Sequence, residues 1–367
     1  MSTSAVFPAH PDQLSAPWLT TMLRESGALD GDRRVGAFDV SPVGSGTGLL
    51  GMVVRLELTY EGGPPGGEPA SLVVKFAHPN AENRAIAMNT RMYEREVSFF
   101  HRIAGAIDVP KPFCHFAAVD SATGENIVVL EDLRAYRCGD QVAGVSPTEA
   151  RAIVDALVPL HAAYWGRTDG ELLADAMRID TSYAESFPPS LYGTWQRGVE
   201  LFADDIHADV LADVERYVQN LPYLHRLMGE RTQTVVHGDV RLDNVMFAEQ
   251  HGQHPVVLLD WQAIMVSNPL HDLAYLASQS LEVDDRRAHE HDLIAHYRAA
   301  LGERGIDVSL ADCVESYDIA ALFLFSYPLI IGGFCDTSDE RGVALARAVL
   351  RRSSATVADR NLFARLQ

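Results

Sequence analysis

The sequence predicts an α+β fold in which a small mixed lobe is followed by a larger helical lobe. Short runs with strand character are concentrated between residues 35 and 133, with one helical pattern among them. From residue 134 onward most apolar residues recur at helical spacing. We therefore expect an N-terminal helical extension at 1–34, a small lobe at 35–133 and a large lobe at 134–367.

The elements of the small lobe begin with a predicted hairpin. Residues 51–60 and 71–77 alternate between apolar and polar positions, and the turn EGGPPGGEPA separates them. The other expected elements are strands at 38–43, 113–119 and 126–130 and helices at 15–26 and 85–104.

The large lobe is predicted to be helical apart from one polar loop and the strands beside it. We expect a helix at 147–165, helical structure through 166–234, and helices from residue 270 onward. Between them, VVHGDVRLDNVMF at 235–247 places polar residues between two apolar runs, and VVLLDW at 256–261 is predicted as a buried strand.

Composition and charge limit the class of protein. The chain has 367 residues, 47% of them hydrophobic, and a formal net charge of −20. Such an acidic surface repels a nucleic-acid backbone, so we expect no nucleic-acid partner, although a nucleotide neutralised by Mg²⁺ is not repelled. The four cysteines form no CxxC pair and are typical of free thiols in a reducing compartment, so we expect a cytoplasmic protein.

Neither the N-terminal stretch nor the long apolar run near the C-terminus predicts a membrane partner. The N-terminal stretch MSTSAVFPAHPDQLSAPW lacks the basic start and long apolar core of a signal peptide. The uncharged run at 319–334 is shorter than a usual membrane span, and Pro328 interrupts it. We expect this run to form a buried core helix.

The polar loop carries the residue types that phosphoryl transfer needs. Asp239 and Asn244 lie on the loop, and Asp260 ends the following strand. Asn244 and Asp260 would suit Mg²⁺, which proteins hold with few side chains plus phosphate oxygens, while Asp239 could accept a proton from a hydroxyl group. Singly, Asp239, Asp243 and Asn244 also fit turn formers and Asp260 fits a cap; their combination between strands favours the functional interpretation.

Phosphate-binding groups are expected in the small lobe. VGSGTGLLGMVV at 43–54 includes Gly46, Thr47 and Gly48, where backbone N–H groups could approach phosphate oxygens, although an ordinary hairpin turn looks the same. Lys75 lies between apolar residues, where a lysine is costly unless it is paired. Its expected partner is Glu96, with Glu94 as the second choice.

These residues resemble a known superfamily. Lys75, Glu96, VVLEDL, HGDVRLDN and LLDWQ follow the order and spacing of the aminoglycoside phosphotransferase and choline kinase-like superfamily, over about residues 40–280. HGDxxxxN followed by a strand ending in Asp is the specific part of this pattern. LEDL, RLDN, Asp260-Trp261-Gln262 and HDLAYL resemble the branch that contains ecdysteroid kinase-like proteins and the kinase-like domain fused to some acyl-CoA dehydrogenases.

The resemblance implies a protein-kinase-like two-lobed fold that binds ATP and Mg²⁺ in its cleft. It implies Asp239 as the catalytic base, Asn244 and Asp260 as metal ligands, and Lys75 on the α- and β-phosphates with Glu96 as its partner. The backbone at Glu131 and Leu133, in VVLEDL, would meet the adenine ring.

The resemblance also implies supporting residues. His237 and Asp272 would brace the loop, Gln262 would contact metal or substrate, and His161 is expected to be a packed histidine rather than a catalytic one. Two departures from eukaryotic protein kinases stand out: Gly238 replaces an Arg, and no DFG or APE-like segment follows. Without an activation segment to hold a peptide, the expected acceptor is a small molecule.

The predicted function is therefore ATP- and Mg²⁺-dependent phosphorylation of a small-molecule hydroxyl group by a monomer or homodimer. Acids in 166–234 would suit a cationic aminoglycoside, and Phe187, Tyr192 and Trp195 would suit a flat apolar alcohol, with 329–339 as a lip of the pocket. Most of these acids and aromatics fit equally the solvated and core faces of ordinary helices. One alternative is a catalytically silent kinase-like module that binds a nucleotide or ligand. Another is a metal-dependent hydrolase that uses His237, Asp239, Asp260 and His271.

Overall fold

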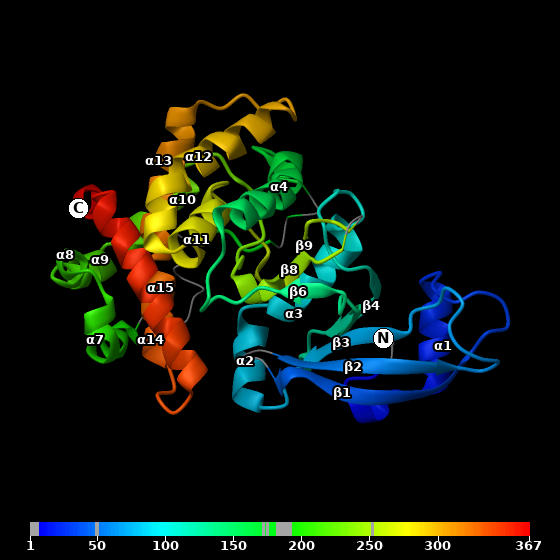
Figure 1. Ribbon diagram of the computed structural model, residues 1–367. Coiled ribbons are helices and arrows are strands. Elements are labelled where there is room, and N and C mark those ends of the chain that lie inside the picture. The colour runs from blue at the N-terminus through cyan, green and yellow to red at the C-terminus, as the bar shows by residue number, and fades with distance from the viewer. Residues whose placement is uncertain (1–6, 48–50, 171–172, 174–175, 181–192, 251–252) are drawn as a thin grey trace. The chain divides into compact units, whose positions relative to one another are not determined.

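The computed structural model describes residues 7–47, 51–170, 173, 176–180, 193–250 and 253–367. The chain divides into two compact units. Unit 1 comprises Met1–Ala106 and Lys111–Arg134, and unit 2 comprises Ile107–Pro110 and Ala135–Gln367. Figure 1 labels their helices and strands. Unit 1 is rich in strands and unit 2 in helices, so the predicted α+β class is confirmed.

Unit 1 is built on a five-stranded antiparallel sheet in the order β1-β2-β3-β5-β4. Its strands are β1 (Val35–Thr47), β2 (Gly51–Tyr60), β3 (Ser71–Ala77), β4 (Cys114–Asp120) and β5 (Glu125–Glu131). The predicted bounds of β2 and β3 are confirmed, because alternation and the intervening turn define both strands.

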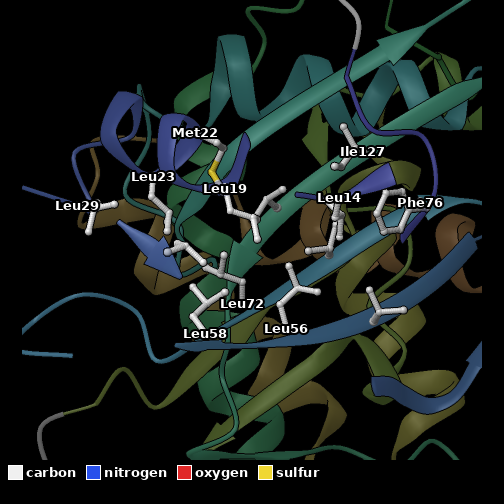
Figure 2. Packing of buried hydrophobic residues seen from close by; sticks show 14 of the residues in the cluster. Leu14, Leu19, Met22, Leu23, Leu29, Leu56, Leu58, Leu72, Phe76 and Ile127 are labelled. Atoms are coloured by element: carbon white, nitrogen blue, oxygen red, sulfur yellow. The ribbon is translucent and has the colours of Figure 1, made fainter. Parts of the chain in front are cut away.

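The N-terminal helix supplies part of the core of this sheet. Ser15 caps α1 (Ala16–Glu25) by accepting a hydrogen bond from the Trp18 N–H. The buried residues of α1 pack with alternate residues of the strands into one apolar cluster (Figure 2). Labelled members of this cluster are Leu14, Leu19, Met22, Leu23, Leu29, Leu56, Leu58, Leu72, Phe76 and Ile127. The segment expected as an extension therefore shares its core with the sheet.

A second apolar cluster joins β4 and β5 to the broken helix after β3. The cluster comprises Val97, Ala117, Val128 and Leu130. The single helix predicted at 85–104 is wrong: the chain forms α2 (Ala81–Asn89), α3 (Met92–Ser98) and a π-helical turn, η2 (Phe99–Ile103).

The break between α2 and α3 has a local cause. Arg91 has a left-handed backbone (φ 54°), which stops the helical hydrogen-bond ladder. The Thr90 hydroxyl donates to the Ile86 carbonyl (2.7 Å) and closes α2, while Arg95 Nη1 donates to the Thr90 carbonyl (2.6 Å) and joins the two helices. Apolar periodicity runs through the break, which is why the pattern suggested one helix.

Unit 2 contains two small sheets and a set of helices (Figure 1). One sheet pairs β7 (Thr234–Val236) with β10 (Met265–Ser267), and the other has the order β6 (Tyr136–Cys138), β8 (Val245–Ala248), β9 (Val256–Leu258). The helices are α4 (Pro147–Tyr164), α7 (Trp195–Phe202), α8 (Ala208–Leu211), α9 (Val214–Gln219), α10 (Leu221–Gly229), α11 (His271–Ser280), α12 (Val283–Gly302), α13 (Leu310–Leu324), α14 (Ser326–Phe334) and α15 (Glu340–Asp359).

The predicted elements of unit 2 are mostly confirmed. A capping box between Ser146 and Glu149 fixes the start of α4. The helical prediction for 166–234 holds from Trp195 onward among the described residues, and β9 ends three residues earlier than expected because Asp260 leaves the strand conformation. The apolar run forms α13 and α14; Leu310–Phe334 is apolar enough to span a membrane, but 78% of its apolar window is buried in the protein. A core position is thus confirmed.

Candidate active site

The polar loop begins with a glycine that no other residue could replace without strain. Gly238 follows β7 with φ 85°, and a Cβ at this position would lie 2.4 Å from the Ala263 carbonyl oxygen. This close approach to the chain before β10 explains the departure from the Arg of eukaryotic protein kinases. It also lets the backbone turn Asp239 away from the strand.

A buried carboxylate at the start of α11 holds this turn. Asp272 accepts hydrogen bonds from the backbone N–H groups of His237 (2.7 Å) and Gly238 (2.9 Å) and from Nε2 of His161 (3.0 Å). Burial raises the pKa of Asp272, but the hydrogen bond and charge of His161 outweigh it, so that the pKa falls to about 2. The bracing role expected of Asp272 is confirmed.

His161 and His237 are held by hydrogen bonds rather than free to react. His161 is fully buried, and its Nδ1 lies 2.9 Å from the Tyr297 hydroxyl. Nε2 of His237 donates to the Leu259 carbonyl (2.8 Å), and its Nδ1 accepts from the Asp239 N–H (3.3 Å). The packed position predicted for His161 is confirmed, and His237 joins the loop to the chain after β9.

Asn244 orients the carboxylate of Asp239. Its Nδ2 donates to the Asp239 carbonyl (3.0 Å) and to Asp239 Oδ2 (3.1 Å). This orientation leaves the side-chain oxygen of Asn244 without a hydrogen bond to any described residue. An amide held in this way presents to a cation the oxygen that Mg²⁺ prefers.

Strand pairing brings Asp260 to the same end of the sheet as Asn244. Val245 pairs with Leu258, and the Leu259 N–H donates to the Asn244 carbonyl (2.8 Å). Asp260 then adopts a left-handed backbone (φ 62°), a strained conformation that is concentrated at functional sites. Gln262 Nε2 donates to Asp260 Oδ2 (3.0 Å). Two oxygen-bearing side chains at one strand end fit a Mg²⁺ site completed by phosphate oxygens.

Two residues of this site were missed by the sequence reasoning. Arg241 Nε lies 3.3 Å from Asp239 Oδ2, and the negative charge of Asp239 raises the pKa of Arg241. Tyr275, from α11, is buried; burial first and the Asp239 charge second raise its pKa. Arg241 lies inside the quoted motif RLDN, and Tyr275 lies inside HDLAYL. For Arg241 the available signal was a positive charge two residues after the predicted base.

The loop is supported from behind by residues distant in the sequence. Gln141 Oε1 accepts from the Leu242 N–H (2.8 Å), and Arg341 of α15 donates to Asp243 (2.8 Å) and Asp140 (3.2 Å). The loop directly after Arg241 is thereby held within unit 2.

Unit 1 contains the predicted lysine pair. Lys75 lies in β3 opposite Val128 of β5, and its Nζ is 2.6 Å from Oε1 of Glu96 in α3. The Lys75 and Glu96 side chains are 17% and 2% exposed, whereas Glu94 is half-buried without this contact. A pair this buried holds the ammonium group in a defined place. Its contact with phosphates stays a prediction.

The other expected nucleotide contacts have a mixed status. Gly46 and Thr47 are the last two residues of β1, and Gly48 lies outside the described residues. Glu131 ends β5, and Leu133 follows in the connection to unit 2. Between them Asp132 accepts hydrogen bonds from Arg55 Nε (2.8 Å), Ser71 Oγ (2.7 Å) and Arg134 Nε (2.7 Å). Asp132 of LEDL therefore holds this segment in a defined conformation.

The residues expected for a hydrolase or an acceptor pocket receive less support. Within the part of the chain that the structure describes, no three His, Cys, Asp or Glu side chains are grouped to hold a metal ion. His271 is buried and its burial lowers its pKa. Trp195 begins α7, while Phe187 and Tyr192 lie outside the described residues.

Fold and loop together define a kinase-like protein, and solved structures show the same fold. A Ralstonia eutropha JMP134 protein classed with the aminoglycoside phosphotransferases is 18% identical with a TM-score of 0.56, covering 95% of this chain and 98% of its own. A microcompartment-associated aminopropanol kinase is 15% identical with a TM-score of 0.54, covering 94% and 98%. The GDP complex of aminoglycoside 2'-phosphotransferase-IIIa is 13% identical with a TM-score of 0.51, covering 94% and 99%.

The chain belongs to the ecdysteroid kinase-like family, whose model matches residues 45–308. The resemblance drawn from the motifs is thus confirmed. Among curated relatives, acyl-CoA dehydrogenase family member 11 is 27% identical over 178 residues in Pongo abelii and 28% identical over 178 residues in Homo sapiens. Each match covers 46% of this chain and 20% of the relative, so the chain matches about one fifth of the length of those proteins.

Proposed function

We propose that the protein is a phosphotransferase that moves the γ-phosphoryl group of ATP to a hydroxyl group of a small molecule. The arrangement of Asp239, Asn244 and Asp260 carries this proposal. The Asp239 carboxylate is oriented by the Asn244 amide, and Asn244 precedes β8 while Asp260 follows β9, at one end of these paired strands, where their oxygens would serve as ligands. Family membership and the paired Lys75 support it.

In the proposed reaction, Asp239 accepts the proton of the acceptor hydroxyl. The hydroxyl oxygen forms a bond to the γ-phosphorus while the bond from that phosphorus to the β-phosphate oxygen breaks, so the products are a phosphate ester and ADP. Asn244 keeps the carboxylate of Asp239 in one orientation, so no reorganisation is needed during the step.

Asn244 and Asp260 would hold Mg²⁺, which neutralises charge on the phosphates. Glu96 would keep Lys75 charged and directed at the α- and β-phosphates, because an ammonium group this buried is stable only beside an anion. Gly46, Thr47, Gly48 and the backbone at Glu131 and Leu133 would complete the nucleotide contacts.

A silent binding module is the weaker candidate, because Lys75, Glu96, Asp239, Asn244 and Asp260 are all present. A metal-dependent hydrolase is weaker still, because the described residues hold no acid or histidine cluster for a resident metal. A small-molecule acceptor agrees with the aminoglycoside 2'-phosphotransferase and the aminopropanol kinase among the structures of the same fold.

The test is ADP release from ATP or GTP with Mg²⁺ across a panel of acceptors. The panel holds aminoglycosides, macrolides, choline, sterol alcohols and hydroxyacyl-CoA thioesters, and the control is Asp239→Asn. We expect acceptor-dependent ADP release that disappears in the variant. A wild-type protein that binds no nucleotide, or turnover that survives in Asp239→Asn, would refute the proposal.

A further inference from the structure

The guanidinium group of Arg241 is placed at the catalytic loop with its hydrogen-bonding capacity unused. Its Nε is buried 3.3 Å from Asp239 Oδ2, but the N–H is not aligned for a hydrogen bond. Among the described residues, no acceptor takes a hydrogen bond from the group. The side chain is 36% exposed, so part of the guanidinium faces outward.

A buried arginine of α15 shows what a structural guanidinium looks like. Arg352 is almost fully buried and donates to the carbonyl oxygens of Gln141 (2.7 Å), Gln279 (3.2 Å) and Val142 (2.9 Å) and to Glu282. An arginine that only supports the fold is expected to be saturated in this way. Arg241 is not, although it lies among acids.

The backbone dictates where Arg241 points. Its neighbours Val240 and Leu242 are almost fully buried in unit 2. With both neighbours packed inward, the side chain of Arg241 is turned to the surface that carries the Asp239 carboxylate. Asp260 and Asp243 are near enough for their charges to act on Arg241 together with that of Asp239. The guanidinium therefore lies beside the proposed base, and the charge of Asp260, a proposed metal ligand, also acts on it.

We propose that Arg241 is a catalytic residue that binds the phosphoryl group during its transfer, an inference that rests on the proposed function. A group moving from ATP to the acceptor would lie beside Asp239 and the proposed ligands Asn244 and Asp260. Its three equatorial oxygens carry the charge that develops in the transition state. A planar guanidinium with unused N–H groups matches two such oxygens at once, as arginine does with other phosphates.

A competing assignment gives Arg241 to an anionic group on the acceptor. The contact with Asp239 favours the phosphoryl group instead. Arg241 approaches the same oxygen, Oδ2, to which Asn244 donates, so it is anchored at the base itself and not at an outer wall of the site. It also offsets repulsion between the Asp239 carboxylate and an incoming phosphate.

The experiment compares Arg241→Gln, Arg241→Lys and the control Arg226→Gln, in which an exposed arginine of α10 is changed in the same way. Both acceptor phosphorylation and ATP hydrolysis without acceptor are measured. We expect Arg241→Gln to lower kcat of both reactions by about 10²–10³-fold, the loss typical of removing one transition-state donor. The KM values should change less than about 3-fold, and Arg241→Lys should recover part of the rate because the charge remains.

Two results would overturn the inference. Wild-type kcat in Arg241→Gln would show that the group is not needed, and a higher acceptor KM with unchanged ATP hydrolysis would assign it to the acceptor. If Arg241→Gln does not fold, as judged by circular dichroism, Arg241→Lys decides: an unchanged kcat with a raised acceptor KM contradicts the proposal. Failure of the proposed function is distinguishable, because then the wild type itself turns over no ATP.

Discussion

The charged residues proposed to function in the two units are held in place differently: Lys75 by an ion pair in unit 1, and Asp239 by a hydrogen-bond network in unit 2. In unit 1 the ion pair of Lys75 with Glu96 joins two buried or largely buried side chains that are 21 residues apart in the sequence. In unit 2 Asp239 depends on Asn244 directly and on Asp272 and Gln141 through the loop backbone. A buried pair can be inferred from the cost of a lone buried charge, whereas a distributed network becomes visible only when distant segments meet.

This difference predicts different responses to mutation. A substitution of Lys75 or Glu96 in unit 1 should remove the whole interaction of that pair, and its effect should be confined to the surroundings of the pair. In unit 2 the effect of a substitution should decrease with its distance from Asp239, because several hydrogen bonds together position this residue. Substitutions at increasing distance from Asp239 therefore test whether the two units differ in this way.

The largest effect is expected for Asp239→Asn. The amide cannot accept the hydroxyl proton, so kcat should fall by about 10³-fold, within the range for loss of a general base. Nucleotide affinity should stay within about 3-fold, because the phosphate contacts remain. Steady-state ADP release and calorimetric titration with ATP separate the two quantities, and a parallel loss of affinity would place Asp239 in binding instead.

The next effect is expected for Asp272→Asn, which removes a buried charge that three donors share. The free energy of unfolding should fall by about 3 kcal/mol, the lower end for breaking a buried charged network. Chemical denaturation followed by circular dichroism measures this change.

The pH dependence of that variant provides its control. The pKa of Asp272 is about 2 in the folded protein, below its usual value near 4. A depressed acid pKa contributes stability above the usual value, and that stability is lost as the pH falls through the folded value. The difference between wild type and Asp272→Asn should therefore be constant above about pH 5 and shrink toward about pH 2. A difference that does not depend on pH would contradict the ionised, braced carboxylate.

A smaller effect is expected for Glu96→Gln in unit 1. Lys75 would lose its counter-charge and its fixed position, lowering turnover by about 10- to 100-fold, equivalent to about 1.4–2.8 kcal/mol. Glu94→Gln is the matched control on the same helix and should behave like the wild type. If the control is the damaging variant, the lysine has been assigned the wrong partner.

The smallest effect is expected for Arg341→Gln. Arg341 is 60% exposed, and its contacts with Asp243 and Asp140 are those of a surface network. Such pairs contribute about 0–1 kcal/mol, so turnover should change less than about 5-fold. A loss as large as that of Asp272→Asn would show that the rear of the loop, and not α11, controls it.

The sequence predicted what local chemistry determines. Alternation and the Pro/Gly turn predicted β2 and β3, the helical spacing of apolar residues predicted α4, and the motif singled out Asp239, Asn244 and Asp260. The break at Arg91 was missed because the apolar period continues through it, and the end of β9 was missed because a left-handed Asp has no local signal.

The supports of the site were harder to predict. Gln141 reaches Leu242 across 101 residues, and Arg341 reaches Asp243 across 98 residues. Nothing in the local sequence around the loop predicts these contacts. The role proposed for Arg241 was equally hard to predict, because it depends on the fold leaving the guanidinium N–H groups of Arg241 without a hydrogen-bond acceptor among the described residues.

The most direct measurement of the central claim is calorimetric titration of ATP, with and without Mg²⁺, into the wild type, Lys75→Met and Asp260→Ala. If Lys75 and Asp260 both contribute to nucleotide binding, ATP binds the wild type more tightly with Mg²⁺. Asp260→Ala should then lose the gain from Mg²⁺, and Lys75→Met should bind ATP about 10-fold more weakly, a loss of about 1.4 kcal/mol. Equal binding by all three proteins, or no binding by the wild type, would contradict the claim.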